Sequence, residues 1–83
     1  MATFEEVRRI KERHEAELME KAGVVGCAIG YKQVGGKKTD ELSIVCYVIE
    51  KKPEGKLRKQ DIIPKKIEGI PTDIIESGEI RAL

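Results

Sequence analysis

The residues most able to do chemistry lie in one short stretch, GYKQVGGKKTDE, at residues 30–41. Glycines followed by a lysine can cradle a phosphate, because backbone N–H groups and an ammonium group then point at it. A phosphate-binding loop, however, has the pattern GxxxxGK followed by Ser or Thr at the start of a helix. Here Gly35-Gly36-Lys37-Lys38 lacks that spacing and leads into a strand-like run. The stretch therefore favours the bend of a β-hairpin, since glycine supplies the positive φ of tight turns.

His14 is the only histidine of the chain. As a general base it would need a nucleophile and an orienting acid within reach. Ser43 and Ser77 lie in strand-like surroundings, and Cys27 could partner the histidine only in principle. A structural histidine on the apolar face of a helix is the simpler interpretation. The sequence has no CxxC and no Cys/His cluster, so we expect no catalytic residue, no metal site and no cofactor.

Two interpretations of Cys27 and Cys46 stay open at the level of sequence. If the strands that carry them pair with these residues opposite each other, the two could form a strained, redox-labile disulfide. In a reducing cytoplasm both are more simply small buried thiols. A count of free thiols in the unfolded, unreduced protein distinguishes the two.

Length and composition limit the chain to one small globular domain, residues 1–83. The chain is 40% hydrophobic and 37% charged, with a formal net charge of +1. It is too apolar for a disordered chain, and its net charge gives no global attraction to nucleic acid or membrane. It has no apolar run as long as a membrane span, and its first residues are too charged for a signal peptide. We therefore expect a cytoplasmic location and no membrane partner.

An amphipathic helix is predicted at about residues 3–22. Thr3-Phe4-Glu5-Glu6 fits a capping box, in which a hydroxyl and a carboxylate satisfy the first backbone N–H groups. Residues of one face then recur at steps of three and four. They are Val7, Ile10, His14, Leu18 and Ala22. Glu17 and Lys21 are spaced for an ion pair, and Gly23 is a natural end of the helix.

A β-hairpin is predicted at about residues 24–50, because VVGCAIGYKQV and LSIVCYVIE are rich in β-branched residues. A register with Cys27 opposite Cys46 and Val34 opposite Thr39 produces two faces. The bulky face comprises Val25, Cys27, Ile29, Tyr31, Leu42, Ile44, Cys46 and Val48. The second face sets Val24, Gly26, Ala28 and Gly30 against Ser43, Val45, Tyr47 and Ile49. Since neither face is properly polar, we expect both to be covered, one of them by the helix.

The remaining chain is predicted to hold a linker at 51–61 and short strands within about 62–76, at 62–67 and 70–75. Pro53 and Gly55 interrupt the preceding strand. Pro64 and Pro71 cannot donate ladder hydrogen bonds, so we place them at strand ends or at a sheet edge. The whole predicts an α+β fold, in which an N-terminal amphipathic helix packs on a small, mainly antiparallel sheet of about four strands.

Charge is segregated along the chain despite the small total. Residues 51–66 carry seven basic and two acidic residues. The basic ones are the candidate partner-binding residues Lys51, Lys52, Lys56, Arg58, Lys59, Lys65 and Lys66. They could dock an acidic partner, or they could only keep a solvated loop soluble. Because the segment has no aromatic residues for stacking on bases, we do not expect a nucleic-acid partner.

A resemblance to a known family covers about residues 24–83. The stretches that carry it are Val24-Val25-Gly26, Ile29-Gly30-Tyr31-Lys32, Gly35-Gly36, Glu50-Lys51-Lys52, Ile63-Pro64, Gly69-Ile70-Pro71-Thr72-Asp73 and Gly78-Glu79-Ile80-Arg81-Ala82-Leu83. In this order they resemble the N-terminal, pre-catalytic domain of bacterial proteins related to trypsin-like serine proteases. The resemblance implies that a chymotrypsin-like catalytic body follows such a domain. Its histidine-bearing and serine-bearing motifs have no counterpart here, so no catalytic residue carries over and no peptidase activity is expected.

Two functions follow as hypotheses. The first is a non-catalytic interaction or regulatory leader domain that docks on a protease-like body or on a second copy, through sheet edges and an apolar face. The alternative is a free-standing binding module that uses the basic segment 51–66 for an acidic or nucleic-acid partner. Salt-sensitive binding to polyanions would favour the alternative, and self-association that is insensitive to salt would favour the first.

Overall fold

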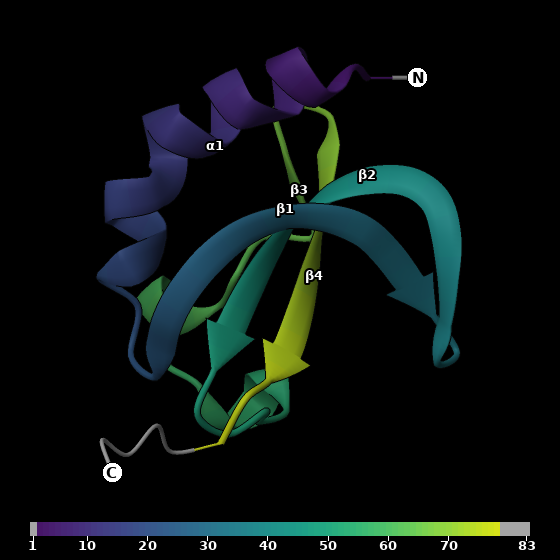
Figure 1. Cartoon of the computed structure of the whole chain (residues 1–83). Coiled ribbons are helices and arrows are strands. Elements are labelled where there is room, and N and C mark those ends of the chain that lie inside the picture. Colours follow the sequence, from purple (N-terminus) through teal and green to yellow (C-terminus); the bar gives the residue numbers. More distant parts are fainter. Residues whose placement is uncertain (1, 79–83) are drawn as a thin grey trace, which may run out of the picture.

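The computed structural model describes residues 2–78 and contains one helix and a four-stranded sheet in the order β1-β2-β4-β3 (Figure 1). The helix is α1 (Phe4–Met19), and the strands are β1 (Val24–Val34), β2 (Lys37–Val48), β3 (Lys66–Ile67) and β4 (Ile70–Glu76). Two single-turn 3-10 helices, η1 (Glu54–Lys56) and η2 (Lys59–Asp61), lie between β2 and β3. The predicted α+β architecture with a mainly antiparallel sheet is confirmed.

α1 begins where the sequence predicts and ends earlier. The Thr3 hydroxyl oxygen accepts a hydrogen bond from the Glu6 backbone N–H at 3.2 Å, which satisfies one of the N–H groups at the helix start. The helix stops at Met19 rather than at residue 22. The chain then turns toward β1 through Gly23, whose φ of +83° suits a residue without a side chain.

β1 and β2 form a hairpin whose central register agrees with the sequence, with Cys27 opposite Cys46. The turn consists of Gly35 and Gly36 alone, with φ of +59° and +79°. A two-residue turn with both φ values positive matches the natural twist of paired strands. The glycine pair thus closes a hairpin, and the lysines that follow belong to β2 rather than to a phosphate-binding loop.

Two bulges separate the observed register from the predicted one: one in β2 between Lys38 and Leu42, opposite Lys32, and one in β1 before Gly26. At the first, the Lys32 carbonyl accepts a hydrogen bond from the Thr39 hydroxyl at 2.7 Å, and Val34 pairs closer to the turn than expected. The second precedes Gly26 and rotates Val24 onto the core, although the alternating pattern assigned Val24 to the other face. The bulge before Gly26 adds one residue to β1, so the strict alternation of faces fails beyond it.

The second face of the hairpin is closed by the hairpin itself. β1 and β2 form a pronounced arch (Figure 1), and at its far end Lys32 Nζ donates to the Thr72 carbonyl at 2.9 Å. Val45 is consequently only 4% exposed, although it lies on the face away from α1. Small residues permit the bend, since a Cβ at Gly30 would lie 3.3 Å from the Val45 side chain. The expected cover of this face is therefore supplied at Val45 by the curl of the hairpin rather than by another element.

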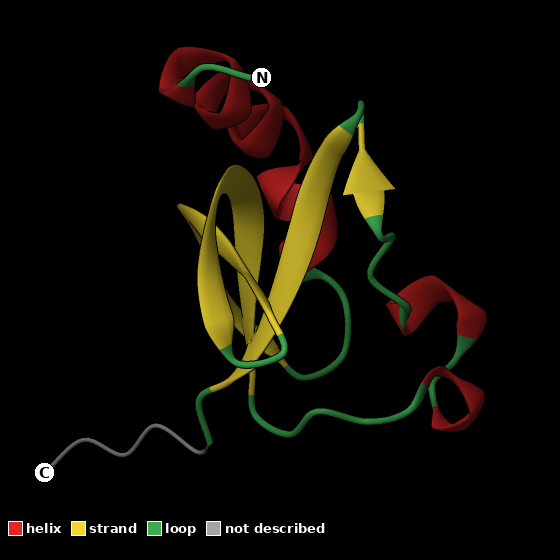
Figure 2. Cartoon of the chain, turned by 90° about the vertical axis from the view of Figure 1, so that its right-hand side faces the viewer, coloured by secondary structure: helices red, strands yellow, loops and turns green. Residues whose placement is uncertain are grey.

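β4 pairs with β2 in parallel and with β3 in antiparallel fashion. β3 has only two residues, instead of the predicted run at 62–67. The reason is that Asp61 still belongs to η2 and that Pro64 has no N–H to donate. The segment with η1 and η2 lies beside β4 on the side away from β2 (Figure 2), so part of the β4 edge faces this segment instead of a strand.

The core lies between α1 and the bulky face of the sheet, which decides which of the two faces the helix covers. Its buried members come from the helix, from β2 and from the last third of the chain. They are Val7, Leu18, Ile44, Cys46, Val48, Ile63, Ile67 and Ile70. The helix contributes Leu18, which is 2% exposed, and is thereby fixed on the sheet.

Shortening Leu18 tests this packing. We expect Leu18→Ala to lower the free energy of unfolding by about 2–5 kcal/mol, because it removes buried methyl groups and leaves a cavity. Urea denaturation followed by circular dichroism measures the change. Met19→Ala is the matched control, since Met19 is the next residue and is 42% exposed. Equal losses in the two variants would contradict the placement of α1.

Candidate functional site

Two adjoining hollows lie between the sheet and the segment that joins β2 to β3, and both border β4. Their volumes are about 280 Å³ and about 500 Å³. Lys51, Glu54, Ile63 and Ile74 line both, so the two hollows form one depression. We call this depression, with these four residues at its centre, the β4 groove.

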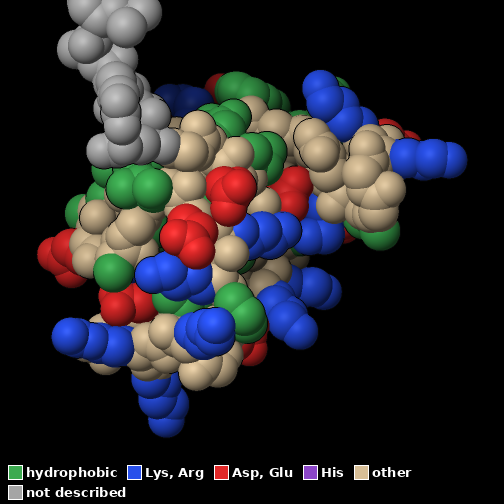
Figure 3. Space-filling model, turned by 90° about the horizontal axis from the view of Figure 1, so that it is seen from below, with side chains coloured by type: hydrophobic (Ala, Val, Ile, Leu, Met, Phe, Trp, Pro, Cys, Tyr) green, Lys and Arg blue, Asp and Glu red, His purple; other side chains and the backbone are tan. Residues whose placement is uncertain are grey.

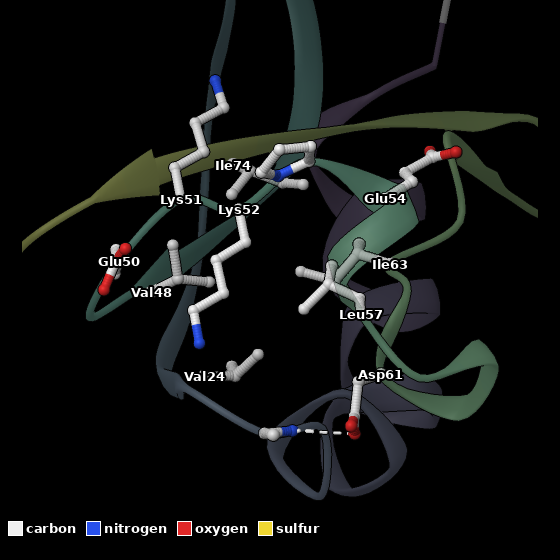
Figure 4. A pocket seen from close by; sticks show the side chains of 12 residues that line it. Val24, Val48, Glu50, Lys51, Lys52, Glu54, Leu57, Asp61, Ile63 and Ile74 are labelled. Carbon is white, nitrogen blue, oxygen red and sulfur yellow. Dashed lines mark hydrogen bonds between the residues drawn. The ribbon is translucent and has the colours of Figure 1, made fainter.

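The smaller hollow has an apolar lining (Figure 4). The apolar side chains around it come from β1, β2, β4 and the segment between β2 and β3. They are Val24, Val48, Leu57, Ile63 and Ile74. Lys52 extends across the hollow, whereas Lys51 points away from it (Figure 4). An apolar side chain of a partner would lose contact with water here, which is favourable by roughly 25 cal/mol per Å².

The larger hollow is lined by lysines from separate parts of the chain. They are Lys32, Lys51, Lys65 and Lys66. Among the described residues, none of their ammonium groups lies within 4 Å of a carboxylate. Asp73 also lines the hollow, but its carboxylate accepts a hydrogen bond from the Gln33 backbone N–H at 3.0 Å. Unpaired positive charge at a concave surface attracts anionic groups.

The outer wall of the β4 groove is tied to the end of α1. The Asp61 carboxylate accepts a hydrogen bond from the Ala22 backbone N–H at 3.0 Å (Figure 4). Lys21 Nζ donates to the Gln60 carbonyl at 2.7 Å. Lys21 therefore does not form the ion pair with Glu17 that its spacing suggested. These two contacts fix η2, and with it the wall, against the helix.

The seven basic residues predicted as a partner-binding set do not gather in one patch. Lys51, Lys52, Lys65 and Lys66 line the β4 groove. Lys56, Arg58 and Lys59 are exposed on or beside the 3-10 turns and line neither hollow. Seen from below (Figure 3), Lys and Arg side chains spread over the surface with acidic side chains among them. Because the tight turns η1 and η2 point successive side chains in different directions, the basic residues of segment 51–66 do not share one surface.

Two parts of the groove, Lys32 and the apolar lining, were not predicted from the sequence. Lys32 reaches the groove because β2 bulges opposite this residue and β1 curls back to β4, and an alternating pattern contains neither feature. The apolar lining did leave a signal, since Leu57 and Ile63 interrupt a run of charged residues. An isolated apolar residue in a basic segment indicates that part of the segment packs against the body of the protein.

His14 has a structural contact in place of a catalytic one. His14 Nε2 lies 2.7 Å from a Glu68 carboxylate oxygen, and Arg13 Nη1 donates to the same carboxylate at 2.7 Å. The hydrogen bond with His14, followed by the charge of Arg13, holds the pKa of Glu68 below its ordinary value of 4.5. Ser43 and Ser77, the candidate nucleophiles, instead donate to backbone carbonyls. The cluster joins α1 to the β3–β4 turn.

The lowered pKa of Glu68 makes its contribution to stability depend on pH. A carboxyl whose pKa is depressed on folding stabilises the fold above its unfolded pKa, and the contribution disappears as the pH falls through the folded pKa. We therefore expect Glu68→Gln to lower the urea midpoint above about pH 5 and to match the wild type near about pH 3. Glu20→Gln, at the exposed end of α1, is the control for loss of one charge. A pH-independent difference would contradict this role of Glu68.

The two cysteines lie directly opposite each other on β1 and β2, and both are free thiols. Burial raises the pKa of the Cys46 thiol to about 12, and Cys27 adds to the shift. Burial also raises the pKa of Cys27, which the neighbouring Cys46 partly offsets. A raised pKa lowers the thiolate fraction at neutral pH, and the thiolate is the reactive form. The interpretation as unreactive thiols, with Cys46 buried and Cys27 half-buried, is thus favoured over a redox-labile disulfide.

A thiol titration tests this interpretation. We expect the folded protein to react slowly with a coloured disulfide reagent at about pH 8, since few thiolates form at that pH. Unfolding the unreduced protein in guanidinium should release both thiols to the reagent rapidly. Finding no thiols in the unfolded, unreduced protein would mean that a disulfide joins Cys27 and Cys46.

Residues 2–78 lack the features of a membrane-spanning helix and of a metal site. No helix in this range is long and apolar enough to cross a membrane. The same range holds no group of three or more His, Cys, Asp and Glu side chains that could hold a metal ion. Every buried side-chain nitrogen or oxygen there has a hydrogen-bond partner. The β4 groove is the feature that combines concave shape, apolar lining and unpaired charge.

Comparison with known protein families gives a match over most of the chain. Residues 1–77 match the family model described as the NARROW LEAF 1 N-terminal domain. No curated protein matches the chain. The match covers α1 and all four strands, so it concerns the whole described fold.

The match overturns the resemblance drawn from short stretches of sequence. The matching family is a plant protein family, and the expected origin as a bacterial, trypsin-like serine protease-related domain is wrong. The stretches behind that resemblance are largely structural. Gly69 forms the β3–β4 turn with φ of +83°, and Gly35-Gly36 forms the hairpin turn. Residues 79–83, which closed the resemblance, lie outside the described range.

Proposed function

We propose that this chain, which belongs to the NARROW LEAF 1 N-terminal domain family, is a non-catalytic protein-interaction domain that binds an acidic partner in the β4 groove. The observation that carries the proposal is the junction of two environments at Ile63 and Ile74. One side of these residues is an apolar hollow, and the other is a hollow lined by lysines without carboxylate partners. Apolar contact gives affinity, and charge gives selectivity and a faster encounter.

The chemistry of the groove supports a protein partner over a nucleic acid. Nucleic-acid sites usually combine a continuous basic surface with aromatic side chains that stack on bases. The aromatic residues of this chain are Phe4, Tyr31 and Tyr47, and none of them lines the groove. Carboxylates at Glu41 and Glu54 interrupt the lysines. A chain of phosphates would meet these carboxylates, whereas a peptide can alternate acidic and apolar side chains.

A second candidate function, self-association, has one specific observation in its favour. β1 is an edge strand of the sheet. Near its end at the hairpin turn, the Tyr31 side chain is 53% exposed and the Val34 side chain is 59% exposed. A long edge strand with exposed apolar side chains can pair with a second copy. Analytical ultracentrifugation over a range of concentrations and salt distinguishes this candidate, because such pairing would persist at high salt.

Charge reversal at the rim tests the proposed function. A library of short random peptides displayed on phage would be selected against the wild-type domain. We expect the selected peptides to be acidic with apolar residues between the acids, and to bind more weakly as salt rises. The double variant Lys51→Glu/Lys65→Glu should weaken their binding by at least about tenfold, since a lost charge interaction costs on the order of 1 kcal/mol.

The matched control is Lys56→Glu/Lys59→Glu. It makes the same change in net charge within the same segment, but both positions lie outside the groove. We expect it to keep nearly all of the binding. Equal losses in the two double variants would show that only net charge matters, and tighter binding to single-stranded oligonucleotides than to peptides would also contradict the proposal.

A further inference from the structure

The outer edge of β4 is only partly used within the chain. Successive residues of a strand direct their backbone N–H and C=O groups to opposite edges. The Ser77 N–H donates to the Val48 carbonyl of β2 at 2.8 Å. The Thr72 N–H points to the opposite edge of β4 and donates to the Lys65 carbonyl at 3.0 Å. It follows that Thr72, Ile74 and Glu76 direct their backbone groups to the edge that borders the β4 groove.

Some backbone groups on this edge have no hydrogen-bond partner within residues 2–78. The Thr72 carbonyl accepts a hydrogen bond from Lys32 Nζ at 2.9 Å, and the Ile74 N–H donates to the Asp73 carboxylate at 3.1 Å. The Ile74 carbonyl and the Glu76 N–H have no hydrogen-bond partner among residues 2–78. In a parallel ladder, one residue of an added strand bonds to a carbonyl and to the N–H two residues later. The Ile74 carbonyl and the Glu76 N–H have this spacing, so an added parallel strand could bond to both.

The surroundings of these two groups identify the kind of strand that fits. The Ile74 side chain lines both hollows of the groove. Lys51, Lys65 and Lys66 lie along the lysine-lined hollow without a carboxylate within 4 Å. A strand laid along β4 would therefore place side chains both near unpaired ammonium groups and near an apolar hollow.

We propose that an extended, acidic segment of a protein partner adds as a strand to the outer edge of β4, bonding to the Ile74 carbonyl and the Glu76 N–H. The inference rests on the proposed function, because it takes the β4 groove as the binding surface. Carboxylates of the added strand face Lys51 and Lys65, and its apolar side chains enter the smaller hollow. In strand addition the main-chain hydrogen bonds give affinity and the side-chain pockets give specificity.

Around Cys27, β1 offers such a segment no unpaired positive charge within the described part of the chain. The charged side chains that act on Cys27 of β1 are Lys11 and Glu15, and these two pair with each other at 3.3 Å. Their charges are thus already matched within the chain. Charge complementarity favours the edge of β4 as the place where an acidic strand adds.

Two substitutions at one position separate the backbone from the side chain. Glu76→Pro removes the free N–H, whereas Glu76→Ala keeps the N–H and removes only the carboxylate that accepts from the Lys51 backbone at 2.8 Å. Proline is tolerated at a strand end on a sheet edge, and position 76 is the last residue of β4. The Glu76 N–H does not take part in the β2–β4 ladder, so the ladder keeps its hydrogen bonds in both variants.

The probe is a fluorescein-labelled peptide of alternating valine and glutamate, followed by fluorescence anisotropy. We expect Glu76→Pro to weaken its binding by about tenfold, as for the loss of a main-chain hydrogen bond, and Glu76→Ala to leave it within about twofold. The same peptide with its backbone N–H groups methylated should lose binding to the wild type. Peptide addition should also slow hydrogen exchange of the Glu76 N–H in the unmodified domain.

The outcomes separate this inference from the proposed function. If the peptide binds Glu76→Pro and wild type equally but fails to bind Lys51→Glu/Lys65→Glu, the groove is the site and strand addition is wrong. If the wild type does not bind the peptide at all, strand addition is wrong, while the library selection still decides the proposed function. A concentration-dependent dimer that Glu76→Pro abolishes would make a second copy the occupant and overturn the assignment to an acidic partner.

Discussion

The fold depends on one constraint, which is that β2 must be covered on both faces. Ile44 is fully buried on one side of the strand and Val45 is 4% exposed on the other. α1 covers only the first side, so the second must be covered by the sheet itself. The hairpin achieves this by a bulge in β2 opposite Lys32 and by curling until Lys32 reaches the Thr72 carbonyl. Small residues on the inner side of β1 make room for the bend.

The β4 groove exists because the chain forms little strand after the hairpin, namely the two residues of β3 and the seven of β4. β4 completes the sheet on one side of β2, but only β3, with two residues, pairs with its outer edge. Beyond Thr72 that edge faces two 3-10 turns, which cannot form a ladder. The apolar residues Leu57 and Ile63 of this segment still pack toward the core, so the space between them and β4 is hollow and apolar. Lysines at the surface then border it.

Local patterns in the sequence predict the elements better than they predict the site. The cap at Thr3 and the glycine pair at 35–36 are local signals, and the structure contains both. The mixed character of the sheet is not local, because the parallel pairing of β4 with β2 depends on where a crossing loop ends. Half of the groove could be anticipated from the basic run at 51–66. Lys32 could not, because its position depends on a bulge that alternation of side chains does not reveal.

The hydrogen bonds that hold η2 against α1 have an entropic consequence. Asp61 and Lys21 fix the outer wall of the groove before any partner arrives. A ligand entering between this wall and β4 has to order its own chain but little of the domain. Since ordering a flexible backbone costs roughly 1–2 kcal/mol per residue, a preorganised wall leaves more of the contact energy available as affinity.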